Sequence, residues 1–290
     1  MTVMTAFDVL VIVLIGIIEG ITEWLPVSST GHMLIFDELV TLNASAEFKE
    51  FFFVIIQLGA ILAVVTVFLK RMLPFGVAST APVNGENGKN TKKLYLKTDT
   101  LLLWAKVALA CVPSAVIGLI FDDLLSEYFG SPYVVALMLI LYGAAFIIVE
   151  KMLVHRTRKC DSLENITFLQ AFIIGLFQVL SLIPGTSRSG ATIIGALIIG
   201  VGRTVGAEFT FFLAVPTMLG ASALKLFKYG FALSGAEIAA VLIGLAVAYT
   251  VSLAAIRFLM DFVKKHSFAP FGIYRIALGV LVLILGLIRG

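Results

Sequence analysis

Residues 15–31, IGIIEGITEWLPVSSTG, and residues 174–190, IGLFQVLSLIPGTSRSG, decide the fold of this chain. Each stretch begins as an apolar helix and then breaks at a proline that is followed by hydroxyl-bearing residues and glycine. Each lies inside a longer apolar segment, at 7–40 or 166–202, that loses its apolar character and regains it within about half a bilayer. This pattern predicts two broken or re-entrant helix pairs in a membrane protein.

The composition supports the membrane environment. Of the 290 residues, 60% are hydrophobic and 13% are charged, whereas a soluble domain carries about 25% charged residues. Six further apolar runs approach or exceed the roughly 20 residues that a spanning helix needs, and they cover 51–69, 100–121, 132–150, 208–224, 237–257 and 270–288. The predicted fold class is an all-α integral membrane protein with six spanning helices and two re-entrant helix pairs.

The two halves of the sequence resemble each other. After the prolines of the quoted stretches, Ser29 aligns with Ser187 at an offset of 158, and the same offset aligns the Glu-Phe dipeptides at 50–51 and 208–209. An internal duplication explains these matches better than chance similarity between apolar helices. The sequence therefore predicts one membrane domain over 1–290, with repeat 1 at about 7–150 and repeat 2 at about 166–288.

Loop charges predict the orientation. Basic residues gather in the segments 70–99, 151–165 and 257–265, which are expected to be cytoplasmic. Acidic residues gather in 37–50 and 122–127, which suits the outer side. An odd number of spans separates the two interrupted segments, so the halves are predicted to form an inverted-topology repeat with both termini outside. Lys225 and Lys228 fall on the outer side, against the charge rule.

Glu19 and Glu23 lie four residues apart on an otherwise apolar helix, and therefore on one face. Two like charges in a low-dielectric setting repel, so the pair is expected to bind a cation, share a proton or face water. A helix end in contact with solvent is the plainer interpretation, and a divalent-metal site or a general base are the functional ones. A hydroxyl at Ser29 with His32 close by suggests a nucleophile and its base.

Residues 184–190 have the composition of an anion-binding loop. Glycines allow close backbone approach, hydroxyls can donate, and the following helix would aim its N-terminal amides at an anion. Arg188 adds a planar fork that suits phosphate oxygens, although Glu19 or Glu23 could instead be its partner. Broken helices of inverted repeats meet near the membrane midplane, so the two polar patches are expected to face one another. Such an assembly suits phosphoryl transfer from a lipid.

These motifs resemble a known family. Residues 19–32, EGITEWLPVSSTGH, look like the glutamate-rich motif of the undecaprenyl-pyrophosphate phosphatases, the bacitracin-resistance family. Residues 184–192, PGTSRSGAT, are similar to that family's second signature, and the resemblance runs over nearly the full length. It implies removal of the terminal phosphate of undecaprenyl pyrophosphate, which recycles the lipid carrier for cell-wall synthesis and confers bacitracin resistance. It also implies a divalent cation, Mg²⁺ or Ca²⁺, and a site that opens outward.

Carried onto this chain, the resemblance assigns roles to residues of both motifs. The expected catalytic residues are Ser29, His32, Glu23, Glu19 and Arg188. The expected contacts to substrate phosphate are Ser28, Thr30, Ser187, Arg188, Ser189 and Thr192. The expected metal ligands are Glu19 and Glu23. The nucleophile stays open between Ser29, His32 and a water activated by Glu23, with Ser29 favoured.

Two rival functions fit parts of the sequence. A transporter or flippase for polyprenyl-phosphate lipids would also use inverted repeats, but it would not need a serine, a histidine and a phosphate cradle together. A lipid-binding scaffold would not need the glutamate pair. The expected partners are a polyprenyl pyrophosphate lipid and the bilayer of a bacterial inner membrane, with no nucleic acid. Small residues at Gly195, Gly200 and Gly244 permit close helix packing, within the chain or in a homodimer.

The remaining sequence signals are negative. Cys111 and Cys160 lie far apart without metal-ligand spacing, so both are expected to be structural. The N-terminus lacks a basic region before its apolar stretch, so no cleavable signal peptide is expected.

Overall fold

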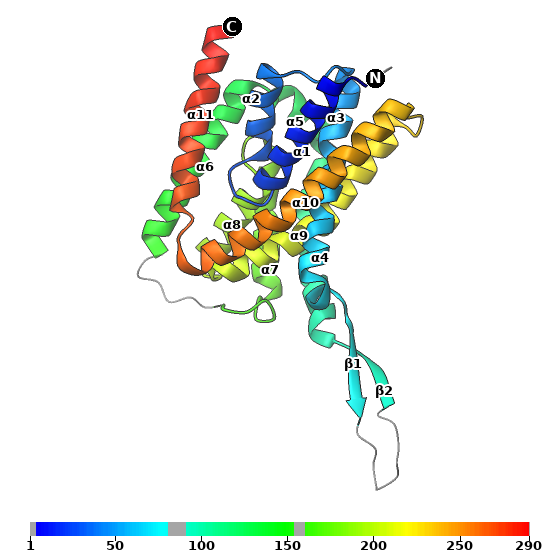
Figure 1. Ribbon diagram of the computed structural model, residues 1–290. Coiled ribbons are helices and arrows are strands. Elements are labelled where there is room, and N and C mark those ends of the chain that lie inside the picture. The colour runs from blue at the N-terminus through cyan, green and yellow to red at the C-terminus, as the bar shows by residue number, and fades with distance from the viewer. Residues whose placement is uncertain (1–3, 81–90, 154–159, 290) are drawn as a thin grey trace.

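The computed structural model describes residues 4–80, 91–153 and 160–289, which are almost entirely helical (Figure 1). Among these residues, six segments are long and apolar enough to cross a membrane: Ala46–Met72, Thr98–Phe121, Pro132–Leu153, Arg203–Tyr229, Gly235–Lys265 and Ala269–Ile288. Each contains one of the predicted spans. The all-α membrane fold is therefore confirmed, and the protein crosses the membrane several times.

The helices follow the same order in both halves of the chain. The first half contains α1 (Ala6–Thr22), α2 (Ser29–Leu39), α3 (Ala46–Ile55), α4 (Gln57–Met72), α5 (Thr98–Phe129) and α6 (Pro132–Leu153). The second half contains α7 (Phe168–Val179), the short 3₁₀ helix η1 (Leu180–Leu182), α8 (Arg188–Ile198), α9 (Arg203–Tyr229), α10 (Gly235–Lys265) and α11 (Ala269–Arg289). Helices α3 and α4 together form one span.

Both interrupted segments form pairs of short helices, as predicted. Helix α1 has 17 residues, α7 has 12, and α2 and α8 have 11 each, so each is shorter than the roughly 20 residues needed to cross a bilayer. Capping boxes at Thr5 and Thr167 begin the first helix of each pair. The side-chain oxygen of such a cap accepts from a free amide of the first turn and fixes where the helix starts.

The loop between the helices of each pair has an unusual backbone at its last residue. Among the described residues, Ser28 and Ser187 are the non-glycine residues with positive φ, at 75° and 69°. Each caps the next helix, because its hydroxyl accepts from the amide of Gly31 or Gly190, at 3.3 and 3.2 Å. Ser28, rather than Ser29, is therefore the counterpart of Ser187. The second loop has one residue more between its proline and its capping serine, so the offset of 158 does not hold there.

Glycines bring the first helix of each pair into close contact with a long helix of the other half. A Cβ atom at Gly175 of α7 would lie 2.3 Å from the carbonyl oxygen of Ala110 in α5. A Cβ atom at Gly16 of α1 would lie 2.9 Å from the Cβ atom of Val247 in α10. Since real Cβ contacts are longer than this, only glycine allows these helix pairs to pack as they do.

The two ends of the molecule differ in their elements. The start of α1 and the end of α11 lie at one end, and a β-hairpin extends from the opposite end (Figure 1). Lys225, which opposes the charge rule, forms an ion pair with Glu50 at 2.7 Å. This lysine therefore lies beside the acidic 37–50 segment, where its charge is neutralised.

The hairpin was not predicted from the sequence. Strands β1 (Phe75–Thr80) and β2 (Thr91–Leu96) pair antiparallel, with Phe75 opposite Leu96 and Gly76 opposite Tyr95. The segment had been expected to be a basic loop. Several charges behind the predicted orientation lie outside the described residues or have side chains that are not described, namely Lys89, Lys92, Lys93, Asp122, Asp123, Glu127, Arg156, Arg158 and Lys159.

The three small residues considered for helix association are used within the chain. A Cβ atom would lie 2.6 Å from the Phe177 ring at Gly195 and 2.7 Å from Ile56 at Gly244. Gly200 has a φ of 86° and lies in the turn after α8. The homodimer stays a prediction. Both cysteines are free thiols, as expected of structural residues.

Candidate active site

Glu23 and Arg188 join the two interrupted segments. Glu23 follows the last turn of α1, and Arg188 begins α8. The Arg188 Nη2 atom donates to Glu23 Oε1 at 3.0 Å, and only 11% and 9% of the two side chains are exposed. The Ser189 hydroxyl also donates to the Glu23 carbonyl, at 3.2 Å. The predicted meeting of the two polar patches is confirmed for these three residues.

Arg188 retains a free donor. Its Nη1 atom donates to the carbonyl of Thr210 on α9 at 2.9 Å, and its guanidinium lies 5.7 Å from the centre of the Trp24 ring. Its Nε–H is buried, and no group among the described residues accepts from it. A buried guanidinium with a spare donor can bind an anion at low cost in desolvation.

Ser29 also contacts Glu23. The Ser29 hydroxyl donates to Glu23 Oε2 at 3.1 Å, which is within the range from which a base can take a proton. The two carboxylate oxygens of Glu23 thus have different partners, the guanidinium of Arg188 on one and the hydroxyl of Ser29 on the other. This arrangement places a hydroxyl, a carboxylate and a guanidinium in contact, which are the groups that nucleophilic catalysis with a general base would need.

His32 lies in a separate contact. Its Nδ1 atom is 2.7 Å from the Ser28 carbonyl oxygen, and its Nε2 atom is 2.7 Å from the hydroxyl of Tyr274. A carbonyl oxygen can only accept, so Nδ1 carries the proton of the neutral ring and Nε2 accepts from Tyr274. The predicted pair of Ser29 with His32 is not formed, because the other partners occupy both ring nitrogens and Ser29 turns to Glu23.

Glu19 is the most deeply buried acid of the site. It lies one turn before Glu23 and is 1% exposed. Its Oε1 atom has no hydrogen-bond partner among the described residues. A buried carboxylate oxygen without a partner is costly, so this position suits a proton or a cation.

The predicted phosphate-binding residues fall into two groups. Ser187 and Ser189 lie beside Arg188, with their hydroxyl oxygens 3.1 Å apart. Ser28 is buried at the cap of α2, and Thr30, the second residue of that helix, is exposed. Thr192 is fully buried, and its hydroxyl donates to the Arg188 carbonyl at 2.9 Å. The hydroxyls of Ser187 and Ser189 also have partners within the protein, the Gly190 amide and the Glu23 carbonyl, but both residues lie directly beside Arg188.

Comparison with known proteins gives the family. A family model described as "Bacitracin resistance protein BacA" matches residues 12–281. The chain belongs to the BacA family. It is 57% identical over 278 residues to the undecaprenyl-diphosphatase of Enterococcus faecalis, covering 96% of this chain and 97% of the relative. It is 49% identical to the undecaprenyl-diphosphatases of Desulfitobacterium hafniense and Streptococcus mutans, over 282 and 290 residues, with at least 97% of each chain covered.

Two residues of this BacA-family site were missed from the sequence. Tyr274 contacts His32, and Arg275 contacts the carbonyls of both loops. Both come from α11, more than 80 residues after the second motif. The available signal was an arginine inside the apolar run 270–288, where a charge needs a buried partner.

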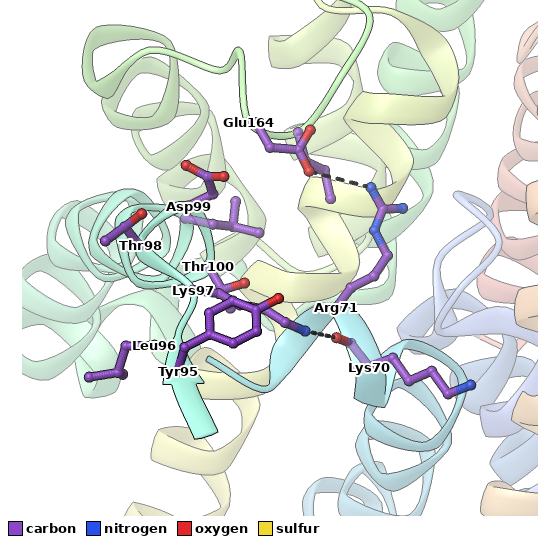
Figure 2. A pocket seen from close by; sticks show the side chains of 11 residues that line it. Lys70, Arg71, Tyr95, Leu96, Lys97, Thr98, Asp99, Thr100 and Glu164 are labelled. Atoms are coloured by element: carbon purple, nitrogen blue, oxygen red, sulfur yellow. Dashed lines mark hydrogen bonds and ion pairs between the residues drawn. The ribbon is translucent and has the colours of Figure 1, made fainter. Parts of the chain in front are cut away.

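A separate cavity lies at the base of the hairpin (Figure 2). It has a volume of about 590 Å³ and is lined by Lys70, Arg71, Tyr95, Leu96, Lys97, Thr98, Asp99, Thr100, Leu103, Leu163 and Glu164. Two of its cations are bonded within the protein: Arg71 to Glu208 at 2.6 Å, and Lys97 to the Lys70 carbonyl at 3.2 Å. No residue of the two loops lines this cavity, so it is distinct from the BacA-family site.

Proposed function

We propose that this protein hydrolyses undecaprenyl diphosphate to undecaprenyl phosphate and inorganic phosphate. This reaction recycles the lipid carrier for cell-wall synthesis, and competition for the same lipid confers bacitracin resistance. The observation that carries the proposal is Glu23, held between the Ser29 hydroxyl and the Arg188 guanidinium inside a membrane protein. Full-length similarity to proteins named undecaprenyl-diphosphatase supports it.

In the proposed reaction, the Ser29 hydroxyl oxygen attacks the terminal phosphorus while the Glu23 carboxylate takes its proton. The bond from that phosphorus to the bridging oxygen breaks, and undecaprenyl phosphate leaves with the bonding electrons. A water molecule then hydrolyses the phosphoserine, which releases inorganic phosphate and restores Ser29. Arg188, through its free Nε–H, and the loop amides stabilise the charge that develops on the phosphoryl oxygens.

A water activated by Glu23 and attack by His32 are the alternative first steps. They differ from attack by Ser29 in the covalent product. We expect rapid denaturation in detergent at mildly alkaline pH, where phosphoserine and phosphohistidine both survive, to leave label from the terminal phosphate of the substrate on Ser29. A label on His32, or no label together with full turnover of Ser29→Ala, would assign the alternative step.

The acidic pair fits a shared divalent cation. Glu19 and Glu23 offer carboxylate oxygens one helical turn apart, and one Glu19 oxygen has no partner. Among the described residues no group of three or more His, Cys, Asp or Glu side chains could hold a metal. Two carboxylates with the remaining ligands from substrate and water are the usual set for Mg²⁺ at phosphates. When bound, Mg²⁺ or Ca²⁺ would neutralise charge on the diphosphate.

The same proposal includes a location and an orientation. The protein is expected in the bacterial inner membrane, with both termini outside and the basic hairpin end in the cytoplasm, because lysine and arginine remain on the cytoplasmic side. The site is expected to open outward. The halves would then form an inverted repeat, with each pair of short helices contributing one loop to the site.

Phosphate release by detergent-purified protein tests the function. Undecaprenyl and farnesyl diphosphate are the substrates, each with and without EDTA. Release that EDTA abolishes and Mg²⁺ or Ca²⁺ restores supports a lipid diphosphatase with a cation at Glu19 and Glu23. Release that continues in EDTA would still support the enzyme activity, and it would assign acid–base catalysis rather than metal binding to Glu19 and Glu23. Absence of release from folded protein would favour a lipid transporter.

A further inference from the structure

Arg275 is a charged side chain in an unusual place. It belongs to the apolar helix α11 and is fully buried, with 0% of the residue exposed. Its partners are the carbonyl oxygens of Pro26, Gly185 and Thr186, at 3.2, 2.8 and 2.9 Å. No carboxylate among the described residues forms an ion pair with it. A guanidinium buried without a counter-ion is costly, so its position needs an explanation.

The three carbonyls belong to two different loops. Pro26 lies in the loop between α1 and α2, and Gly185 and Thr186 lie in the loop before α8. The planar fork of one guanidinium therefore ties the loops together through its two terminal nitrogens. The loops also meet through Glu23, Arg188 and Ser189, so Arg275 provides a second, independent connection between them.

The bonds to Arg275 also orient the loop amides. In a trans peptide the carbonyl of one residue and the amide of the next point in opposite directions. The Thr186 carbonyl points toward Arg275, so the Ser187 amide points away from it. That amide belongs to the residue whose hydroxyl oxygen lies 3.1 Å from the Ser189 hydroxyl oxygen. Arg275 thus holds one side of the loop while the Ser187 amide points to the other.

We propose that Arg275 is a positioning residue for the transfer reaction. It fixes the two loops relative to one another and supplies a positive charge behind the anion site that no protein carboxylate neutralises. This inference rests on the proposed function and concerns how the diphosphate is held. A preorganised positive charge stabilises phosphoryl oxygens most strongly in a site from which water is excluded. The Tyr142 ring, 5.7 Å from the guanidinium, covers another side of it.

Substitution by lysine separates positioning from charge. Arg275→Lys keeps the positive charge but cannot reach three carbonyls in a fixed plane. The matched control is Arg257→Lys on α10, an exposed arginine outside the site. We expect Arg275→Lys to fold, and its kcat for farnesyl diphosphate to fall about 100-fold because the loops are misplaced by a fraction of an ångström to an ångström. KM should change little, and Arg257→Lys should match the unmodified protein.

Trp24 supplies a readout that does not depend on turnover. It is one of two tryptophans, is fully buried, and lies between Arg188 and the edge-on ring of Phe211. In a Trp104→Phe background its emission reports the loop between α1 and α2 alone. We expect Arg275→Lys to shift the Trp24 emission and Arg257→Lys to leave it unchanged. This expectation holds even if neither protein releases phosphate. Absence of phosphate release would overturn the proposed function separately.

Three results would overturn the proposal. The first is a folded Arg275→Lys protein with unchanged kcat and unchanged Trp24 emission. The second is a rise in KM at constant kcat, which would make Arg275 a binding residue only. The third is loss of folded protein in both Arg275→Lys and Arg275→Gln, because the arginine would then support the fold and not the reaction.

Discussion

At the level of single residues, Glu23 has two partners in the structure. It accepts from the Arg188 guanidinium at 3.0 Å and from the Ser29 hydroxyl at 3.1 Å, and in the proposed reaction it also takes the Ser29 proton. An anionic diphosphate that attracts Arg188 would release Glu23 for proton transfer, so substrate binding itself would activate the base.

This relation predicts the behaviour of Glu23→Gln. The amide oxygen can still accept from Arg188, and the amide NH2 group can donate to the Ser29 hydroxyl oxygen, so the protein should fold, but the amide cannot take a proton. We expect kcat to fall by about 100- to 10,000-fold, the usual contribution of a general base. Steady-state phosphate release measures it.

Glu50→Gln is the matched control for that variant. Glu50 makes an ion pair with Lys225, but 70% of its side chain is exposed, and such surface pairs contribute only about 0–1 kcal/mol. It should keep full turnover. Equal activity of the two variants would remove Glu23 from the reaction.

His32 and Tyr274 give a second prediction at this scale. Tyr274→Phe keeps the ring that stacks on His32, at 5.6 Å between centres, and removes only the hydroxyl that His32 accepts from. One hydrogen bond contributes about 0.5–1.5 kcal/mol, so we expect kcat to fall about two- to tenfold.

Tyr133→Phe removes an equivalent hydroxyl that donates to the Gly286 carbonyl, far along α11 from the site. It should leave kcat unchanged. If Tyr274→Phe also had no effect, His32 would not depend on this contact.

The sequence predicted much of the site, and the missed part has a physical cause. Residues within one motif lie close together in the fold because few residues separate them along the chain, so Glu19, Glu23 and Ser29 could be grouped without a structure. Tyr274 is 242 residues from His32, and only helix packing brings them together. Proximity along the chain also suggested the wrong partner for Ser29. His32 is only three residues away, but its ring nitrogens contact the Ser28 carbonyl and the Tyr274 hydroxyl, and the Ser29 hydroxyl donates to Glu23.

At the level of elements, close packing at glycine holds the short helices in place. A Cβ atom at Gly175 would approach a backbone oxygen to 2.3 Å, and backbone cannot rotate away as a side chain can. We expect Gly175→Ala to lower the free energy of unfolding by about 1–3 kcal/mol, the usual cost of overpacking. Thermal unfolding in detergent, followed by fluorescence, measures the change.

Gly220→Ala is the control, because nothing lies within 4 Å of a Cβ atom at that position of α9. There alanine should be neutral or stabilising, since glycine is about 1 kcal/mol worse than alanine inside a helix. Equal loss of stability in both variants would mean that the contact of Gly175 with α5 is not the cause of the loss.

Hydropathy predicted the spanning helices but not the β-hairpin. The spans could be predicted because the bilayer sets their length and polarity. The β-hairpin has strands of six residues and extends from the helical body, so no bilayer constraint acts on it. Its lysine-rich sequence is typical of a loop, and only the pairing of β1 with β2 shows the strands.

At the level of the whole molecule, the orientation is the main untested prediction. Glu50 of α3 and Thr98, which follows strand β2, are exposed. Helix α3 and the hairpin lie at opposite ends of the protein (Figure 1). In a background with Cys111 and Cys160 both replaced by serine, a membrane-impermeant maleimide should label Glu50→Cys on intact cells. It should label Thr98→Cys only after the membrane is opened. The reverse labelling pattern would mean that the protein has the opposite orientation and that the site faces the cytoplasm.

The position of Arg275 and Tyr274 in α11 has a consequence for biosynthesis. The site draws on residues from Glu19 in α1 to Arg275 in α11, so it cannot form until the ribosome has translated the chain as far as α11. Until α11 enters the bilayer, the carbonyls of both loops have no guanidinium to bind. A prematurely terminated chain would therefore be inactive and would expose unpaired polar backbone to lipid, which makes it a substrate for quality-control proteases.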